Sequence, residues 1–353
     1  MRRSKLAVIG TGALGRHHAR ILSGFEHVDL VGVAETNQVA GEKVAAQHNT
    51  RWFADYRDLL PEIDAAIIAV PTFAHLPIAT DCLSRGLPVF VEKPIASDLD
   101  QTREMLALAD VHNTWLQVGH VERFNPAFQA ALPRISKPRY IRAERYSPYA
   151  FRSTDIGVIH DVMIHDLDLI LACVNSPVTR VEAFGMTILG GHEDCVQARV
   201  GFANGCIADI SANRVSPVTL RKMQIWQADG CVDLDLGARE VTTYEPGESL
   251  KYGTPPLERA KLPGADIEQL KAAVFGTFLK VDKPTVLQSD PLTQELLAFV
   301  ESLESGQPPL VGGETALAVM TLAEQIRICV QTHQWGSQPA ETAGMAGVFK
   351  RAA

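Results

Sequence analysis

Short apolar runs alternate with amphipathic helical patterns along the first third of the chain. The runs are bounded by turn residues and fall at 6–9, 28–34, 65–70, 88–93 and 114–119. Strand and helix alternate here without hairpin signals, which predicts an α/β domain built on a doubly wound parallel sheet. We expect this first domain to span 1–119, because the alternation stops near Gly119.

From about Arg139 the apolar positions recur with a period of two. Such runs are found at 140–146, 179–188, 196–202, 206–211, 222–228 and 232–236. Turn signals such as Asn204-Gly205 separate them, which predicts a large open antiparallel sheet packed against a few helices. A helical pattern at 157–170 interrupts the series. The second domain, 120–353, is therefore expected to be α+β.

Composition narrows the class of partner. The chain has 353 residues, enough for two domains, and a formal net charge of −8, which argues against nucleic acid or an anionic membrane as the main partner. Six cysteines occur without any Cys-x-x-Cys pairing, which favours reduced core residues, no metal site and a cytoplasmic location. No segment offers roughly 18 uninterrupted apolar residues, so no membrane span is predicted. A small-molecule ligand is the expected partner.

The first strand runs directly into a glycine-rich turn that opens a helix. The turn has the spacing G-x-G-x-x-G, and its residues are Gly10, Thr11, Gly12, Ala13, Leu14 and Gly15. In this context the glycines permit a tight turn, close approach of a pyrophosphate and close packing of the helix, whose N-terminus faces the phosphates. The motif predicts dinucleotide binding, and the alternative is a glycine-rich turn without a ligand.

Two further strand ends supply residues to the predicted cofactor site. The second strand ends at Glu35, about 20 residues beyond the last glycine, where a carboxylate binds the adenosine ribose. An acid there repels a 2'-phosphate, so NAD is favoured over NADP; a solvated strand-end acid is the alternative. The strand at 65–70 leads into Pro71, Thr72 and His75, which we expect on the cofactor side. His75 could instead contact only water.

Lys93 ends the strand-like run at 88–93, in the sequence Glu92-Lys93-Pro94. The carboxyl edge of an open α/β sheet is where ligands bind, and a partly desolvated lysine can take part in proton transfer. This position makes Lys93 a candidate catalytic residue and places Glu92 beside the cofactor. The alternative is a structural ion pair of Lys93 with Glu92.

The helical segment 157–170 carries a second group of polar residues. Asp161, His165 and Asp168 share one helix face, and a carboxylate one turn before an imidazole can orient it as a general base. A metal pair and a surface ion pair are the alternatives. His160 and Asp166 point elsewhere and are interpreted as surface or structural groups.

Together these motifs resemble the glucose–fructose oxidoreductase, inositol dehydrogenase and MocA family over nearly the whole chain. The resemblance implies a Rossmann domain, a sheet domain that supplies the interface of a homodimer or homotetramer, and NAD(P)-dependent oxidation of a sugar-like hydroxyl. Lys93 matches the family's catalytic lysine, and Asp161 and His165 match its Asp-x-x-x-His pair. Closing the cleft between the domains would assemble this site, and whether His165 or Lys93 accepts the proton stays open.

The stretch from Gln117 to Pro126 carries a narrower similarity. It resembles family members that oxidise the 3-hydroxyl of UDP-N-acetylglucosamine to a ketone, which an aminotransferase then converts to an amine in diamino-sugar lipid A biosynthesis. The similarity implies a nucleotide-sugar substrate held by Lys93, Asp161, His165, His120, Arg123, Asn125 and Arg152. Two alternatives remain: a dehydrogenase of a free polyol or monosaccharide of the inositol type, and a noncatalytic NAD-bound sensor.

Overall fold

The computed structural model describes residues 3–151, 154–335 and 338–339. The chain divides into two compact units that are not consecutive in sequence. Unit 1 comprises Met1–Phe124 and Ser289–Gln325, and unit 2 comprises Asn125–Gln288 and Ile326–Ala353. The segment Ser289–Gln325, which the sequence analysis placed in the second domain, thus belongs with the first.

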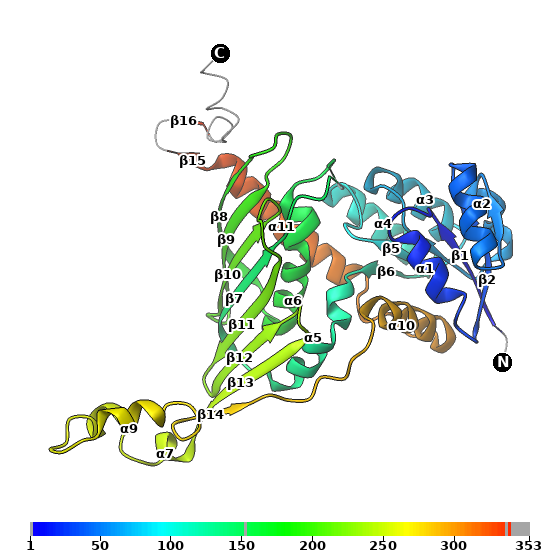
Figure 1. Ribbon diagram of the computed structural model, residues 1–353. Coiled ribbons are helices and arrows are strands. Elements are labelled where there is room, and N and C mark those ends of the chain that lie inside the picture. The colour runs from blue at the N-terminus through cyan, green and yellow to red at the C-terminus, as the bar shows by residue number, and fades with distance from the viewer. Residues whose placement is uncertain (1–2, 152–153, 336–337, 340–353) are drawn as a thin grey trace. The chain divides into compact units, whose positions relative to one another are not determined.

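Unit 1 is built on six parallel strands in the order β3-β2-β1-β4-β5-β6 (Figure 1). The chain enters at β1 and winds outward in both directions, so the carboxyl ends of β1 and β4 lie at the switch point where such sheets bind ligands. The doubly wound α/β class is confirmed. The strands are β1 Ser4–Ile9, β2 Val28–Ala34, β3 Arg51–Phe53, β4 Ala65–Ile68, β5 Val89–Glu92 and β6 Leu116–Gly119.

Helices cover this sheet, and one of them returns from late in the sequence. α10 (Pro291–Ser305) inserts Phe299, whose ring lies 5.9 Å from that of Phe90 and 5.4 Å from that of Trp115. Leu296 and Phe299 are fully buried in the same apolar core as β1 and β4, which is why the return segment packs in unit 1. The other helices of the unit are α1 Gly15–Leu22, α2 Gln38–Gln47, α3 His75–Leu83 and α4 Leu99–Val111.

Several connections of the chain form short helices. Residues 56–62 form two 3-10 turns, η1 Tyr56–Asp58 and η2 Leu60–Glu62, because Pro61 has no N–H to continue an α-helical ladder. Further short helices are η3 Thr72–Ala74, η4 Val121–Phe124, α5 Pro126–Ala131 and η5 Leu132–Arg134. α11 (Gly313–Thr332) begins in unit 1 and ends in unit 2.

Unit 2 is built on an eight-stranded sheet in the order β14-β13-β12-β11-β7-β10-β9-β8. All neighbours are antiparallel except β7 and β10, which are parallel, so the predicted antiparallel sheet is mixed at one pair. The π-helical turn η6 (Ile159–Met163) and α6 (Ile164–Val174) follow β7. The strands are β7 Pro138–Tyr146, β8 Val178–Met186, β9 Cys195–Phe202, β10 Ile207–Asn213, β11 Leu220–Gln227, β12 Gly230–Asp235, β13 Glu240–Pro246 and β14 Leu279–Asp282.

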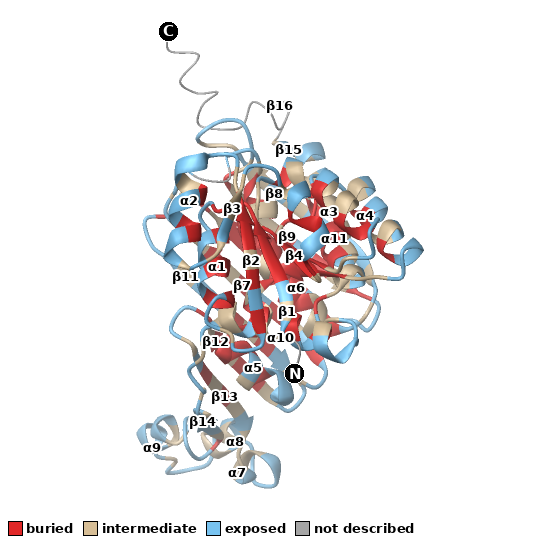
Figure 2. Ribbon diagram, turned by 90° about the vertical axis from the view of Figure 1, so that its right-hand side faces the viewer, coloured by how far each residue is buried: buried red, intermediate tan, exposed pale blue. Residues whose placement is uncertain are grey.

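The pattern of apolar positions did not predict β13 and β14, the last two strands of this sheet. β13 buries Val241 and Thr243 but is otherwise polar, and its partner β14 is only four residues long. Between them the chain makes an excursion of three short helices, which Figure 2 colours mostly as exposed: α7 Glu248–Lys251, α8 Pro256–Arg259 and α9 Ile267–Ala272. The two-residue strands β15 (Gln334–Trp335) and β16 (Gln338–Pro339) pair with each other.

Candidate functional site

The three motif glycines of the turn after β1 have different surroundings. Gly10 has a φ of +89°, and a Cβ there would lie 2.5 Å from the carbonyl oxygen of Ala69. A Cβ on Gly15 would lie 1.9 Å from the carbonyl oxygen of Gly10, whereas a Cβ on Gly12 would meet nothing within 4 Å. The outer glycines are therefore required by packing, and Gly12 leaves open space where a pyrophosphate approaches the backbone. The turn fits a dinucleotide.

Glu35, at the end of β2, is bound to this turn. Its carboxylate accepts hydrogen bonds from the N–H of Thr11 at 2.9 Å, from the hydroxyl of Thr11 at 3.0 Å and from the N–H of Asn37 at 3.0 Å. Burial raises the pKa of Glu35, but these donors outweigh it, and the net pKa lies below the usual carboxyl value. The group is therefore an anion at neutral pH, as ribose binding requires.

Trp52 is a contributor to this corner that the sequence analysis did not identify. Its indole N–H donates to the backbone oxygen of Glu35 at 2.9 Å. A Cβ on Gly41 would lie 2.2 Å from the indole ring, so α2 packs closely against it. A single tryptophan on a three-residue strand gives no periodic signal, which explains why the pattern of apolar positions missed it.

The carboxyl end of β4 leads to the three residues expected on the cofactor side. Pro71 is exposed, Thr72 is 8% exposed and His75 is 1% exposed. The Nδ1 atom of His75 lies 3.0 Å from the carbonyl oxygen of Pro94, and its Nε2 atom lies 2.9 Å from that of Val70. The alternative of a histidine that contacts only water is wrong. The ring links the end of β4 to the turn after β5.

The turn after β5 contains Lys93, which is half-buried. The neighbouring Glu92 is 6% exposed, and its carboxylate accepts hydrogen bonds from His18 Nε2 at 2.7 Å and from the backbone N–H of Lys93 at 3.2 Å. His18 is fully buried on α1. The peptide bond between Lys93 and Pro94 is cis. Sequence reasoning missed His18, although its position three residues after the last motif glycine places it on the face that packs on the sheet.

The predicted substrate residues near 120 fall on either side of the division between the units. In unit 1, His120 is 2% exposed and Arg123 is half-buried in η4. In unit 2, the Oδ1 atom of Asn125 caps α5 by accepting from the N–H of Ala127, and its Nδ2 donates to the backbone oxygen of Leu236 at 3.0 Å. Asn125 therefore has a scaffold role. Arg152 lies outside the described residues.

In unit 2, Asp161 lies in the π-helical turn η6 and His165 lies in the first turn of α6. Both are half-buried. π-helical turns are rare and are frequent at functional sites, and the α-helical spacing assumed from the sequence did not reveal this one. Asp168 is fully buried, so it faces the core.

Ion pairs and a glycine fix the segment that carries these residues. The buried guanidinium of Arg214 bonds Asp194 at 2.8 Å and donates to the backbone oxygen of Ile156 at 2.7 Å. A Cβ on Gly157 would lie 1.9 Å from Oε1 of Glu193, and that oxygen accepts from the N–H of Ile159 at 3.3 Å. The start of η6 is thus held by side chains from the β8–β9 connection and from the end of β10.

Asp166 has a structural role in the same helix. It is 1% exposed and bonds the guanidinium of Arg145 on β7, with distances of 2.8 Å from Nη2 and 3.0 Å from Nε. Of the two interpretations given to Asp166 from the sequence, surface and structural, the second is confirmed. The pair anchors α6 to the sheet.

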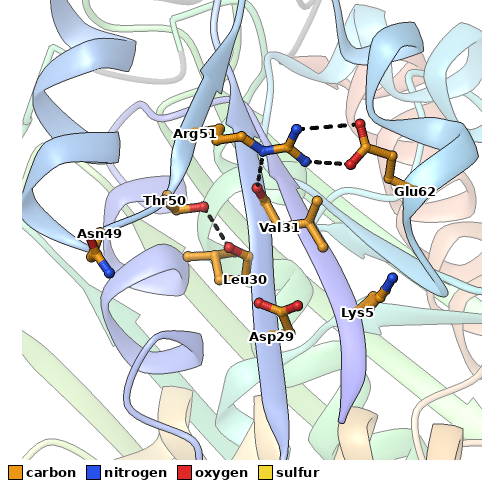
Figure 3. A pocket seen from close by; sticks show the side chains of 8 residues that line it. All are labelled: Lys5, Asp29, Leu30, Val31, Asn49, Thr50, Arg51 and Glu62. Atoms are coloured by element: carbon orange, nitrogen blue, oxygen red, sulfur yellow. Dashed lines mark hydrogen bonds and ion pairs between the residues drawn. The ribbon is translucent and has the colours of Figure 1, made fainter. Parts of the chain in front are cut away.

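A pocket at the other end of the parallel strands does not belong to this site (Figure 3). It lies around the starts of β1 and β2, with Arg51 and Glu62 paired across it. Ligands of doubly wound sheets bind at the carboxyl ends of the strands, where Gly10 and Glu35 lie. Among the described residues no cluster of three or more His, Cys, Asp or Glu is arranged to hold a metal ion, and none of their helices is long and apolar enough to cross a bilayer.

The parallel sheet, the glycine turn and the anionic Glu35 together define an NAD-binding oxidoreductase domain. Residues 4–120 match the model of the oxidoreductase family with an NAD-binding Rossmann fold, and residues 128–232 match the GFO/IDH/MocA C-terminal domain. The chain belongs to the GFO/IDH/MocA family. It is an NAD-dependent dehydrogenase of that family, and NAD is its cofactor.

Individual relatives differ in how much of the chain they match. The chain is 30% identical over 328 residues to UDP-N-acetylglucosamine 3-dehydrogenase from Acidithiobacillus ferrooxidans, covering 93% of this chain and 97% of that protein. A solved structure of that enzyme matches with a TM-score of 0.81 over 94% of this chain and 98% of the other. The scyllo-inositol 2-dehydrogenase (NAD(+)) of Bacillus subtilis is 29% identical over 232 residues, covering 60% of this chain and 68% of that protein.

Proposed function

We propose that this chain oxidises the 3-hydroxyl of UDP-N-acetylglucosamine to a ketone with NAD as acceptor. The observation that carries this proposal is the full-length similarity to the Acidithiobacillus ferrooxidans enzyme, at 30% identity over 93% of the chain and with a TM-score of 0.81. Inositol dehydrogenases are also related: the Bacillus subtilis enzyme is 29% identical over 60% of the chain, and that of Rhizobium meliloti is 23% identical over 91%. Their lower coverage or identity supports the reaction class more than a substrate.

The proposed reaction removes two hydrogens from one carbinol carbon. The hydroxyl proton goes to a protein base and a hydride leaves the carbon, which becomes a ketone. NAD, when bound, supplies the hydride acceptor at C4 of its nicotinamide. We assign the proton to His165 or Lys93, with Lys93 bonding the hydroxyl oxygen and Asp161 orienting the imidazole.

The residues proposed to hold NAD come from four strand ends of unit 1. The glycine turn would bind the pyrophosphate, because its N–H groups and the start of α1 attract anions. Glu35 would bind the adenosine ribose, and Pro71, Thr72 and Glu92 lie at the ends of β4 and β5 that face the cofactor side. The turn consists of Gly10, Thr11, Gly12, Ala13, Leu14 and Gly15.

A nucleotide sugar would need groups beyond the reacting hydroxyl. Arg123 and Arg152 are suitable for diphosphate oxygens, because a guanidinium binds phosphate with two parallel hydrogen bonds. His120 and Asn125 are proposed near the sugar, and the hydrogen bonds of Asn125 within unit 2 limit it to a supporting contact. The 3-keto product would be the substrate of an aminotransferase acting next, and a homodimer or homotetramer stays a prediction.

The test is a reaction of the purified chain with NAD and UDP-N-acetylglucosamine that carries deuterium at carbon 3. Oxidation at that carbon yields deuterated NADH and a product that has lost the label, both read by mass spectrometry. Because the ketone is unfavourable at equilibrium, hydroxylamine is added to trap it. The expected result is trapped keto-sugar nucleotide with the label on the cofactor.

Matched substrates separate this proposal from its alternatives. Free N-acetylglucosamine lacks the diphosphate that Arg123 and Arg152 are proposed to bind. It should therefore turn over at least tenfold more slowly than the nucleotide sugar. Turnover of myo-inositol or scyllo-inositol with none on the nucleotide sugar would contradict the substrate assignment. If no sugar or polyol turned over and NAD still bound, the noncatalytic sensor would replace the enzyme.

A further inference from the structure

His18 is a buried titratable residue for which the proposed reaction has no direct use. It lies on α1, has no exposed surface, and donates from Nε2 to Glu92 Oε1 at 2.7 Å. Its ring also lies edge-on to Phe90, with centroids 5.4 Å apart. Nδ1 has no hydrogen-bond partner among the described residues. Nε2 therefore carries the hydrogen of the bond to Glu92, because a carboxylate only accepts hydrogen bonds.

Glu92 connects this histidine to Lys93. While Oε1 accepts from His18, Oε2 accepts from the backbone N–H of Lys93 at 3.2 Å. The carboxylate is 6% exposed, so its orientation depends on protein donors and not on water. A chain of two hydrogen bonds thus runs from the helix that follows the glycine turn to the backbone of Lys93.

Two further contacts confine the same carboxylate and the same turn. A Cβ on Gly119 would lie 2.8 Å from Oε2 of Glu92, so the end of β6 leaves room for the carboxylate only because it carries glycine. His75 fixes the other side of the turn through the carbonyl oxygens of Pro94 at 3.0 Å and Ile95 at 3.2 Å. The backbone on both sides of Lys93 is therefore tied to buried side chains.

We propose that His18 is a positioning residue for Lys93, acting through Glu92. The inference rests on the proposed role of Lys93 in proton transfer. Rotation of the Glu92 carboxylate would release the N–H of Lys93 and move the lysine Cα, and a displacement of about 1 Å at a reacting group costs on the order of 10²-fold in rate. Because α1 begins at the last glycine of the turn and carries His18, binding of the cofactor and placement of Lys93 both depend on this helix.

The test compares His18→Leu, which removes the donor, with His18→Gln, whose side-chain amide can still donate to Glu92. Leu22→Ala is the matched control, because Leu22 is equally buried on α1 and its side chain cannot hydrogen-bond to Glu92. Three quantities are measured: the Kd of NAD by calorimetry, kcat and KM for the accepted substrate, and the rate at which an amine-acetylating reagent modifies Lys93, read by peptide mass spectrometry. The exposed Lys43 on α2 is the internal reference for acetylation.

His18→Leu is expected to lower kcat on the order of 10²-fold, to leave the Kd of NAD and the KM within about threefold, and to change the acetylation rate of Lys93 but not of Lys43. His18→Gln should restore most of kcat and the acetylation rate. Leu22→Ala should lower stability while Lys93 reacts normally. Gly119→Ala, whose methyl group would displace Glu92 from the other side, should reproduce the effect of His18→Leu. It replaces His18→Leu in the test if that variant does not fold.

Two results would overturn the proposal. One is a normal acetylation rate of Lys93 in both His18→Leu and Gly119→Ala. The other is an equal loss of kcat in His18→Leu and in Leu22→Ala when the two variants lose the same amount of stability. Acetylation of Lys93 requires no sugar substrate. If UDP-N-acetylglucosamine is not turned over, the acetylation rate still decides the role of His18. Failure of the proposal for His18 can therefore be distinguished from failure of the proposed function.

Discussion

Two buried carboxylates next to the proposed proton-transfer residues are held in different ways. Glu92 in unit 1 accepts from one imidazole and one backbone N–H. Asp166 in unit 2 pairs with the full charge of Arg145, whose side chain is 5% exposed. An ion pair fixed by a guanidinium anchors a helix, whereas two weaker hydrogen bonds define the position of one turn. We infer that the Arg145–Asp166 pair serves stability, whereas the buried carboxylate of Glu92 serves placement of the turn at Lys93.

The largest expected effect comes from removing the two proposed proton-transfer groups. Lys93→Met and His165→Asn should each lower kcat by roughly 10³-fold, because a positioned acid or base contributes about 10²- to 10⁴-fold. The Kd of NAD should stay within a few fold for both. His160→Asn, next to Asp161 in the same turn, is the control and should keep most of its activity. Equal losses in all three variants would mean that the turn, and not the proton-transfer groups, was disturbed.

The second effect tests the anchoring role of the buried ion pair in unit 2. Asp166→Asn should lower the free energy of unfolding by about 3 kcal/mol, because it leaves the Arg145 charge buried without a partner. The matched control is Glu182→Gln, which breaks the exposed pair with Arg180 and should cost less than about 1 kcal/mol. Urea titrations of the three proteins give both values. Similar costs for the two variants would remove the distinction drawn between buried and exposed charge.

The outcome of the sequence analysis differs between the same two regions. The site in unit 1 was predictable because a parallel sheet brings consecutive strand ends to one edge, so Gly10, Glu35 and Lys93 could be placed by counting strands. The π-helical turn at Asp161 was not predictable, because the spacing of these residues in the sequence fits both an α-helix and a π-helical turn. His18, Trp52 and Arg214 act through partners distant in sequence, and such contacts leave no periodic pattern.

The same limit explains the division of the chain. A helix with an apolar face can pack on any domain, and the pattern of α10 does not say which. The burial of Leu296 and the fit of Phe299 against Phe90 and Trp115 place it in unit 1. The mixed pair β7–β10 is a similar case, because period-two runs do not distinguish parallel from antiparallel neighbours.

A third effect concerns the anion at the end of β2. Glu35→Gln should weaken NAD binding by roughly tenfold, since hydrogen bonds to a charged group are worth about 1.5–3 kcal/mol, and should improve NADP binding because the repulsion of a 2'-phosphate is lost. Because the pKa of Glu35 lies below its usual 4.5, the preference for NAD in the unmodified chain should be constant from neutral pH down to about that value. Calorimetry with both cofactors measures the change, and an unaltered ratio would exclude Glu35 from the ribose site.

The smallest expected effect is a pH dependence of stability that comes from His75. Burial lowers the pKa of this imidazole below its usual 6.5, although three carbonyl oxygens and Glu92 partly oppose the shift. Below that usual value the unfolded chain binds a proton that the folded chain does not, so stability falls as pH decreases through this window. His75→Gln has no group that titrates there. Its urea midpoint should therefore change less than that of the unmodified chain between about pH 7.5 and about pH 5.5, with Leu22→Ala as a destabilised control that keeps His75. If the unmodified chain and His75→Gln lose stability in parallel, the folded chain binds the His75 proton over the same pH range as the unfolded chain, and the stated direction of its pKa is wrong.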